Sequence, residues 1–478
     1  MKTSVLYSIS FIMMAAPLTA AAGDINNSSN HSAAFARTLT RNASTEVDAA
    51  VYNPAGTAFA KDGLQISVHN QHYLKYDTLV RTEDGSEYTA DDPVFFYPGL
   101  NLVYKLPETP LALSLHVGVP TGGGSKTFAS GHPIFADYQG EVANFVNEAV
   151  WEGLAERNGT TVEEAREQTG PAVDAVLDPN QASIKGASMF IGATFNVAYA
   201  LNDWAAVSIG FRATQGASSY DAFAFYNIEN TDVGELVEAV GESLPDEISI
   251  NVKTEEKAKG VNGIVGLHLK PLDNLEIAAQ WQLNTRMRVE RSFPLEADLD
   301  ESGNLNSSTA SDASPYRVDA EVSRRIFPKD SNRNDIPGVI NLGVKYGATS
   351  DIDLEFGLNY YQNEQAKWGQ DEAGNKTGEY YYNSFEAALS GEWKQDWGVL
   401  SAGYLYSSAS VEPEGQGYLT YSIPSHSVAA GGRYVISESI SMDLGVLHVM
   451  YSSEKDADET REYRKGATGV VVGFDYAW

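Results

Sequence analysis

Five basic residues are the side chains of this sequence best placed to do chemistry. Each lies in a stretch where apolar and polar residues alternate, and the alternation puts it on the polar face. They are Arg212, Arg286, Arg288, Lys345 and Arg433. The polar faces also carry acids that could pair with them, namely Glu276, Glu290, Asp353 and Glu355. The pattern indicates ion pairing inside a polar interior, because buried charges are normally paired.

Residue patterns for catalysis or for metal binding are missing. The chain has no cysteine, which removes disulfides, thiol nucleophiles and cysteine metal sites. It has no Gly-x-Ser-x-Gly, His-Glu-x-x-His or Walker sequence, since the glycine run at 122–127 lacks the required Gly-Lys pair. The eight histidines are scattered singly. We therefore expect no enzyme, cofactor or metal site, and a polar solvated loop wherever acidic residues cluster.

The elements that must position these residues are strands, because period-two alternation recurs from about residue 63 to the last residue. Apolar faces include Met189, Ile191, Ala193, Phe195 and Val197, then Leu275, Ile277, Ala279, Trp281 and Leu283, then Ile352, Leu354, Phe356, Leu358 and Tyr360. A soluble β-sandwich could alternate in the same way. The connections favour a barrel, because short ones alternate strictly with long ones, as periplasmic turns alternate with extracellular loops. Counting between them predicts about fourteen strands.

The two ends of the chain fit an exported barrel. Lys2, the apolar run over 5–16 and the alanines at 20–22 indicate a signal peptide of residues 1–22. The alternative, a membrane anchor, needs about 20 apolar residues. The last strand presents an apolar face that ends at the aromatic Trp478. The formal net charge of −31 argues against a nucleic-acid partner, which would require clustered Lys and Arg.

Two long loops show helical rather than strand periodicity. Phe145 and Val146 lie on one apolar helical stripe, and Leu236 and Val237 lie on another. These stripes either pack together as a lid or form an apolar groove on which a ligand lands.

Residues 23–62 precede the first strand and are small, polar and poor in strand pattern. They contain the turn-forming run Asn53-Pro54-Ala55-Gly56. Fourteen strands enclose a lumen that inward side chains alone do not fill, so we expect this segment to be a plug. The predicted architecture is all-β: a transmembrane antiparallel barrel over 63–478, an N-terminal plug (hatch) in the lumen, and helical extracellular loops.

The sequence resembles the FadL-type outer-membrane transporters of long-chain fatty acids over nearly the whole mature chain. The plug-like run around Asn53-Pro54-Ala55-Gly56 carries most of this resemblance. Ile336-Pro337-Gly338 and Ile423-Pro424-Ser425-His426, each followed by a glycine and a tyrosine, are similar to two further landmarks of the family. The resemblance implies capture of a hydrophobic ligand by outer loops and a lumen closed by the hatch. It also implies sideways exit where the third strand kinks.

The residues needed for such a kink are present in the third predicted strand. Gly118, Pro120 and Gly122 lie close together there, and proline and glycine interrupt strand pairing. Pro120 could instead mark the upper end of that strand. A fatty acid carboxylate in the lumen would need a cation, so the five basic residues are candidate contacts for it.

We therefore expect an outer-membrane channel, multi-pass and monomeric, for passive uptake of long-chain fatty acids or similar hydrophobic molecules. The expected partners are the hydrophobic ligand, outer-membrane lipid and lipopolysaccharide, and the barrel assembly machinery. The alternatives are a general porin for hydrophilic solutes and an outer-membrane lipid hydrolase. Fatty acids, alkanes, aromatic hydrocarbons and terpenoids all remain compatible as ligands.

Overall fold

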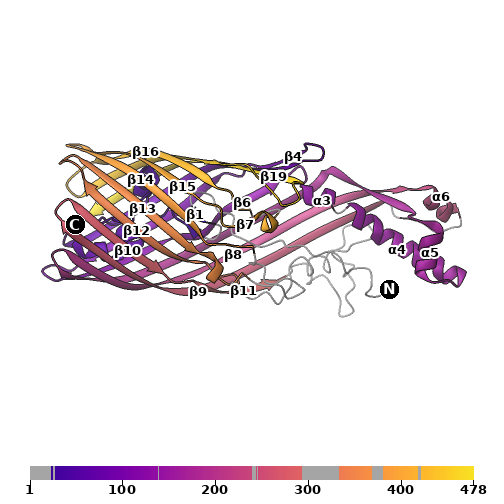
Figure 1. Ribbon diagram of the computed structural model, residues 1–478, viewed down its shortest axis with the longest axis horizontal. Helices are drawn as coiled ribbons and strands as arrows, with labels where there is room; N and C mark the ends of the chain where they lie inside the picture. Colours follow the sequence, from indigo (N-terminus) through magenta and orange to yellow (C-terminus); the bar gives the residue numbers. More distant parts are fainter. Residues whose placement is uncertain are drawn as a thin grey trace.

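The chain folds into a closed antiparallel barrel (Figure 1). The computed structural model describes residues 23–24, 27–137, 139–239, 244, 246–292, 333–368, 380–417 and 421–478. The predicted signal peptide lies outside this part. No helix within it is both long and apolar enough to cross a membrane.

Fourteen strands form the wall over the described residues. Seventeen segments are hydrogen-bonded in a ring, and β4 with β5, β10 with β11, and β17 with β18 are three interrupted strands. The segments are β3 (Gly63–Arg81), β4 (Glu87–Ala90), β5 (Val94–Lys105), β6 (Leu111–Phe128), β7 (Val173–Asn202), β8 (Ala205–Asn230), β9 (Glu247–Leu272), β10 (Leu275–Gln282), β11 (Arg286–Ser292), β12 (Gly338–Gly347), β13 (Ile352–Gln362), β14 (Ser384–Gln395), β15 (Gly398–Ser407), β16 (Ser425–Val435), β17 (Ile440–Tyr451), β18 (Glu454–Lys455) and β19 (Arg461–Ala477). The predicted strand number is confirmed.

The outer surface of the barrel is apolar. Ile191, Phe195, Leu354 and Phe356, all on predicted apolar faces, are exposed, whereas the residues between them face inward and are mostly buried. An apolar outer face with a polar inner face is the arrangement that a bilayer requires of a closed barrel. The protein is therefore a multi-pass barrel of the outer-membrane type.

The two ends of the barrel differ in their connections. The short connections are tight turns between two strands, as at 203–204 between β7 and β8. These turns and the C-terminus lie at one end of the molecule, on the left in Figure 1. Long connections leave the other end, which is the extracellular one by this asymmetry.

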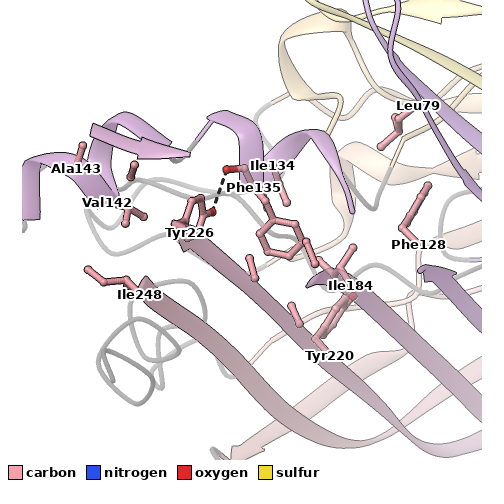
Figure 2. Close-up of a cluster of buried hydrophobic side chains, with 14 of the residues drawn as sticks. Leu79, Phe128, Ile134, Phe135, Val142, Ala143, Ile184, Tyr220, Tyr226 and Ile248 are labelled. Atoms are coloured by element: carbon pink, nitrogen blue, oxygen red, sulfur yellow. Dashed lines mark hydrogen bonds between the residues drawn. The ribbon is translucent and has the colours of Figure 1, made fainter. Parts of the chain in front are cut away.

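Strands β7, β8 and β9 continue far beyond the extracellular rim and carry helices (Figure 1). The helices are α3 (Pro133–Asp137), α4 (Gln139–Asn158), α5 (Val162–Thr169) and α6 (Asp232–Ala239). Figure 2 shows their apolar packing, in which Tyr226 donates a hydrogen bond to the carbonyl of Phe135 at 2.9 Å. In this extension β7 already begins at Val173, which pairs with Asn230 of β8.

The N-terminal segment, residues 27–60, lies inside the barrel and is almost wholly buried. Its elements are β2 (Asn27–Ser28), paired with β1 (Gly23–Asp24), and then α1 (Ala33–Thr38), α2 (Ala49–Tyr52) and the 3-10 helix η1 (Pro54–Phe59). Inward-facing glycines make room for it. A Cβ on Gly403 would lie 1.8 Å from the Thr38 carbonyl oxygen, and one on Gly357 would lie 2.1 Å from Thr40 Oγ1. The backbone of the segment thus rests directly on the wall.

Candidate functional site

The wall of the barrel is incomplete between β5 and β6. Their ladder runs from Lys105, paired with Ala112, to Leu100, paired with Val117. Above that point the described residues of β5 pair only with β3, while β6 continues to Phe128 paired only with β7. A sheet edge left open within a membrane is costly unless other groups satisfy its N–H and C=O groups. This gap is therefore a specific feature of the fold.

Side chains take the place of the missing ladder at the β6 edge. Tyr97 of β5 donates its hydroxyl proton to the Val119 carbonyl at 3.0 Å, and Lys75 of β3 donates to the Ser125 carbonyl. Asp92 accepts hydrogen bonds from the backbone N–H and, at 2.9 Å, from the hydroxyl of Thr127. Side chains can rotate away from an edge, whereas a backbone ladder cannot, so this part of the wall has the means to open.

The three residues predicted to kink the third strand lie at the start of the gap. β6 gains one extra residue relative to β7 between Gly118 and Thr121 and another between Gly122 and Gly124. Such bulges bend a strand away from its neighbour. Gly122 has a φ of 78°, which favours glycine. Pro120 lies ten residues along a strand of 18 and does not mark its end.

Arg212 is the candidate cation that lies beside this kink. A Cβ placed on inward-facing Gly192 would lie 3.1 Å from Arg212 Cδ and 3.0 Å from Pro120 Cγ. The guanidinium donates to Thr194 Oγ1 at 3.1 Å and to Gln282 Oε1 at 2.6 Å. The residue is 4% exposed and makes no ion pair within the described part of the chain. A guanidinium has five N–H donors, so it keeps capacity for an anion.

Lys345 and Arg433 also face the lumen, but acids hold both of them. Lys345 lies 3.3 Å from Asp353. Arg433 lies 2.9 Å from Asp443, 2.7 Å from Asp475 and 3.1 Å from Glu46 of the N-terminal segment. Of the five candidates, these two serve as structural ion pairs in this conformation.

The lumen-facing placement predicted for Arg286 and Arg288 is wrong. Both are exposed, and Arg286 pairs across the ladder with Val261, a residue that is 57% exposed on the outer surface. The inward residue between them is Met287, which is buried. The strand is interrupted over 283–285, between β10 and β11, and this break shifts the alternation by one position. Glu290, expected to face inward, is turned outward by the same shift.

The run Asn53-Pro54-Ala55-Gly56 lies deep in the lumen, at the start of η1. Asn53 Nδ2 donates to the Ser44 carbonyl at 2.9 Å and lies 2.5 Å from His268 Nδ1 on β9. A Cβ on Gly56 would lie 2.4 Å from the same carbonyl oxygen of Ser44. The run therefore folds the segment tightly on itself and ties it to one strand of the wall.

Among the described residues, the ion pairs between the N-terminal segment and the wall all lie on one side. Arg37 binds Glu392 of β14 at 2.6 Å and Asp443 of β17 at 2.8 Å. Within the segment, Arg41 binds Asp48 at 2.8 Å; burial raises the pKa of this carboxyl, but Arg41 more than offsets that and holds the pKa below its usual value. On the opposite side, burial lowers the pKa of His31 to about 3, with help from the nearby positive charge of Arg212. The contacts of His31 near the gap are therefore those of a neutral imidazole.

The predicted ligand-capture residues are divided between interior and surface. Val146 and Val237 are buried, and Val146 belongs to the apolar cluster between the helices and β7 to β9. Phe145 is 38% exposed, and the side chain of Leu236 lies outside the described residues. Val146 thus packs on the strands beside α4, and Phe145 is the one described candidate that offers apolar surface.

Two histidines near Arg212 escaped the sequence analysis. His31 and His116 meet edge to face with ring centroids 5.1 Å apart, and His116 Nδ1 lies 2.8 Å from Asn101 Oδ1. The alternation of β6 would have placed His116 on the inner face. No local signal places His31, because its position depends on how the N-terminal segment folds inside the barrel.

Comparison with known proteins supports the fold. No protein-family model and no curated protein sequence matches the chain significantly. A FadL homologue from Pseudomonas aeruginosa superposes with a TM-score of 0.58 at 13% identity, covering 95% of this chain and 99% of its own. The Pseudomonas putida toluene transporter TodX gives 0.55 at 13%, covering 95% and 100%. The Ralstonia pickettii toluene transporter TbuX gives 0.51 at 12%, covering 91% and 94%. The chain therefore has the barrel fold of the FadL-type transporters, the family that its motifs resemble.

Proposed function

We propose that this protein is a passive outer-membrane channel for hydrophobic molecules that carry a carboxylate, with long-chain fatty acids as the class of ligand. The observation that supports this most is the gap between β5 and β6 beside the buried Arg212. A gap in the wall gives an apolar molecule a sideways path into lipid. A cation without an acidic partner compensates the charge of a carboxylate that leaves water.

In this proposal the N-terminal segment is a hatch that moves on one side. Its ion pairs fasten it to β14, β16 and β17, on the wall away from the gap. Near the gap its contacts are neutral, through His31 and Asn53. Breaking a neutral hydrogen bond costs less free energy than breaking a buried ion pair. Displacement of the hatch near β5 to β9 would open a path from the lumen to the gap while the other side stays fixed.

The route begins at the extracellular lid. Phe145 on α4 provides the apolar first contact, beyond the rim, where α4 packs against the extended part of β7. The ligand then descends to Arg212, where its carboxylate replaces water and meets the free guanidinium N–H groups. The acyl chain leaves through the gap at the kink of β6. Diffusion down a gradient into the bilayer drives the whole path.

A reversible disulfide across the gap tests the exit. A Cβ on Gly124 would lie 2.7 Å from Val94 Cγ2, so the side chains of Val94→Cys and Gly124→Cys would be in direct contact across the gap. The native chain has no other cysteine to interfere. The control pair is Val103→Cys and Ser114→Cys, which already face each other in the closed part of the same ladder. Oxidation should stop palmitate uptake in the first pair only, and reduction should restore it.

Undiminished uptake through the fully oxidised gap pair would refute sideways exit at this place. The general porin remains the second candidate, because the inner face of the wall is polar. It predicts large steady currents from the full-length protein in planar bilayers, whereas the hatch proposal predicts a closed protein.

The carboxylate preference has its own test with matched arginines. Arg212→Gln removes the buried cation, and Arg288→Gln removes one from the outer face of the same barrel. Hydrogen bonds to charged groups contribute about 1.5–3 kcal/mol, so Arg212→Gln should weaken palmitate binding about ten- to hundredfold. Toluene uptake should not change in either variant. Equal palmitate affinity in both would indicate a neutral hydrocarbon as the ligand.

A further inference from the structure

Three lysines converge in the extracellular half of the barrel, away from Arg212. Lys75 is on β3, Lys126 on β6 and Lys465 on β19, and they are neighbours because the barrel closes between β19 and β3. The Nζ atoms of Lys126 and Lys465 lie 4.5 Å and 4.2 Å from the ring centroid of Tyr421, a buried residue of the connection between β15 and β16. Tyr421 donates its hydroxyl proton to Asp77 at 2.9 Å. We call Lys75, Lys126, Lys465 and Tyr421 the lysine site.

The positive charge of the lysine site is only partly compensated. Lys126 pairs with Asp77 at 3.0 Å. Lys75 donates a hydrogen bond to a backbone carbonyl of β6, and Lys465 donates one to the Tyr421 carbonyl at 2.9 Å. Neither lysine makes an ion pair among the described residues. A carbonyl accepts a hydrogen bond but does not cancel a charge, and each ammonium has three N–H donors.

The second acid near these lysines is already engaged. Asp92 accepts hydrogen bonds from the backbone and side chain of Thr127 and, at 3.3 Å, from the hydroxyl of Ser125. Counting Asp77 and Asp92 against the three lysines leaves the described site short of one negative charge. Burial of an uncompensated ammonium is unfavourable, so the site favours one further anion.

Apolar residues adjoin the site and favour an amphiphile over a small inorganic anion. A Cβ built on Gly124 would lie 2.7 Å from Val94 Cγ2 and 3.8 Å from Lys75 Nζ, so an apolar side chain and an ammonium group flank this glycine. Val94 belongs to a buried cluster that includes Tyr73 and Tyr97. A cationic group therefore stands next to an apolar surface, which is the arrangement that a carboxylate with an acyl tail requires.

We propose that the lysine site is a second carboxylate-binding station, which holds the head group of the ligand before it reaches Arg212. This inference rests on the proposed function, because it assumes an acidic hydrophobic ligand. Lys126 is six residues beyond Pro120 on β6, so at about 3.3 Å per residue the two stations are separated by roughly 20 Å or less. The ligand carboxylate would take the place of the neutral carbonyl acceptors at Lys75 and Lys465, while its tail lies along the apolar cluster toward the gap.

Equilibrium binding of palmitate to the full-length protein in non-ionic detergent tests the station. The variants are Lys75→Gln and Lys465→Gln, with Lys455→Gln as the control, since Lys455 forms an exposed ion pair with Glu459 outside the lumen. The wild-type protein should bind palmitate at two classes of site. Either lysine-site variant should weaken one class at least about tenfold, whereas hexadecanol binding and Lys455→Gln should show no change.

Thermal unfolding provides a second measurement. A folding defect would lower the Tm, whereas the proposal predicts that the Tm rises. Because Lys465 makes no ion pair among the described residues and desolvation disfavours its charged form, Lys465→Gln should raise the Tm of the ligand-free protein, and palmitate should raise it further by less than in the wild type. Two binding classes that persist in both lysine variants, or a Tm that falls in Lys465→Gln, would overturn the second station. A single class that is lost in Arg212→Gln would also overturn it while leaving the proposed function intact. If no variant changes palmitate binding, both the second station and the proposed function are refuted.

Discussion

Arg37→Met tests whether ion pairs hold the N-terminal segment in the lumen. Arg37 is 1% exposed and joins the segment to two strands, through Glu392 at 2.6 Å and Asp443 at 2.8 Å. Methionine keeps the side-chain stem, which lies against Gly431 and Gly445. The substitution therefore removes charge and hydrogen bonds while most of the packing remains.

The structure sets the size of the effect. Removing one partner of a buried ion pair costs about 3–5 kcal/mol, because the other charge stays buried and uncompensated. Asp443 would keep Arg433 at 2.9 Å, and Glu392 would keep Arg41 at 3.9 Å. We therefore expect the lower end, about 3 kcal/mol, which weakens docking of the segment roughly 150-fold.

Current through single proteins in planar bilayers measures this change. Wild-type protein should be closed almost all the time, and Arg37→Met should open often enough to be counted. Arg464→Met is the matched control, because Arg464 pairs with Glu87 on the exposed extracellular side. Adding Glu392→Gln to Arg37→Met should reduce the open time. The second substitution removes one of the two carboxylates that lose Arg37, those of Glu392 and Asp443.

An unchanged current from Arg37→Met would refute this reasoning, provided that the barrel is folded. Heat-modifiable gel mobility checks the barrel independently of the lumen. Equal open times in Arg37→Met and Arg464→Met would mean that packing, and not charge, holds the segment.

Three further outcomes follow from the same geometry. Because His31 has a pKa of about 3 when docked and 6.5 ordinarily, the released segment binds a proton that the docked one does not. For His31 alone, docking is therefore strongest above pH 6.5 and weakens by about 1.4 kcal/mol per unit as the pH falls toward 3. Open time should rise with acid in the wild type and rise less steeply in His31→Asn. Pro120→Thr, combined with replacement of the neighbouring glycines by residues that extend the ladder, should close the gap and abolish palmitate uptake, and uptake at the wild-type rate would contradict the placement of the exit. Gly403→Val should displace the segment from the wall at Thr38 and increase the current. Gly391→Ala should not, because a Cβ on the outward-facing Gly391 would lie 3.6 Å from Leu354 Cδ2, an ordinary contact distance. Equal currents in the two variants would count against direct contact between the segment and the wall.

Much of the barrel was predictable, because its signals are local. Alternation identified the outer face of β7 and β13, and the regular succession of short and long connections gave the number of strands. The kink at Gly118, Pro120 and Gly122 was predictable for the same reason, since proline and glycine disturb pairing wherever they occur in a strand. The prediction failed at Arg286 and Arg288, because the strand is interrupted over 283–285. The interruption exchanges the inward and outward positions after it, and the residue types at 283–285 do not reveal it.

The roles of the inward cations could not be predicted from any local pattern. Arg212, Lys345 and Arg433 look alike in sequence, yet among the described residues acids pair with the last two and not with the first. Their partners are distant along the chain, as Glu46 is from Arg433, and closure of the barrel alone brings Lys465 next to Lys75. A transmembrane barrel with a polar lining, tight turns and a site of strand disruption follows from the sequence alone. Tertiary structure decided which charges are compensated and where the wall is open, because ion pairing depends on distances in space that alternation along one strand does not encode.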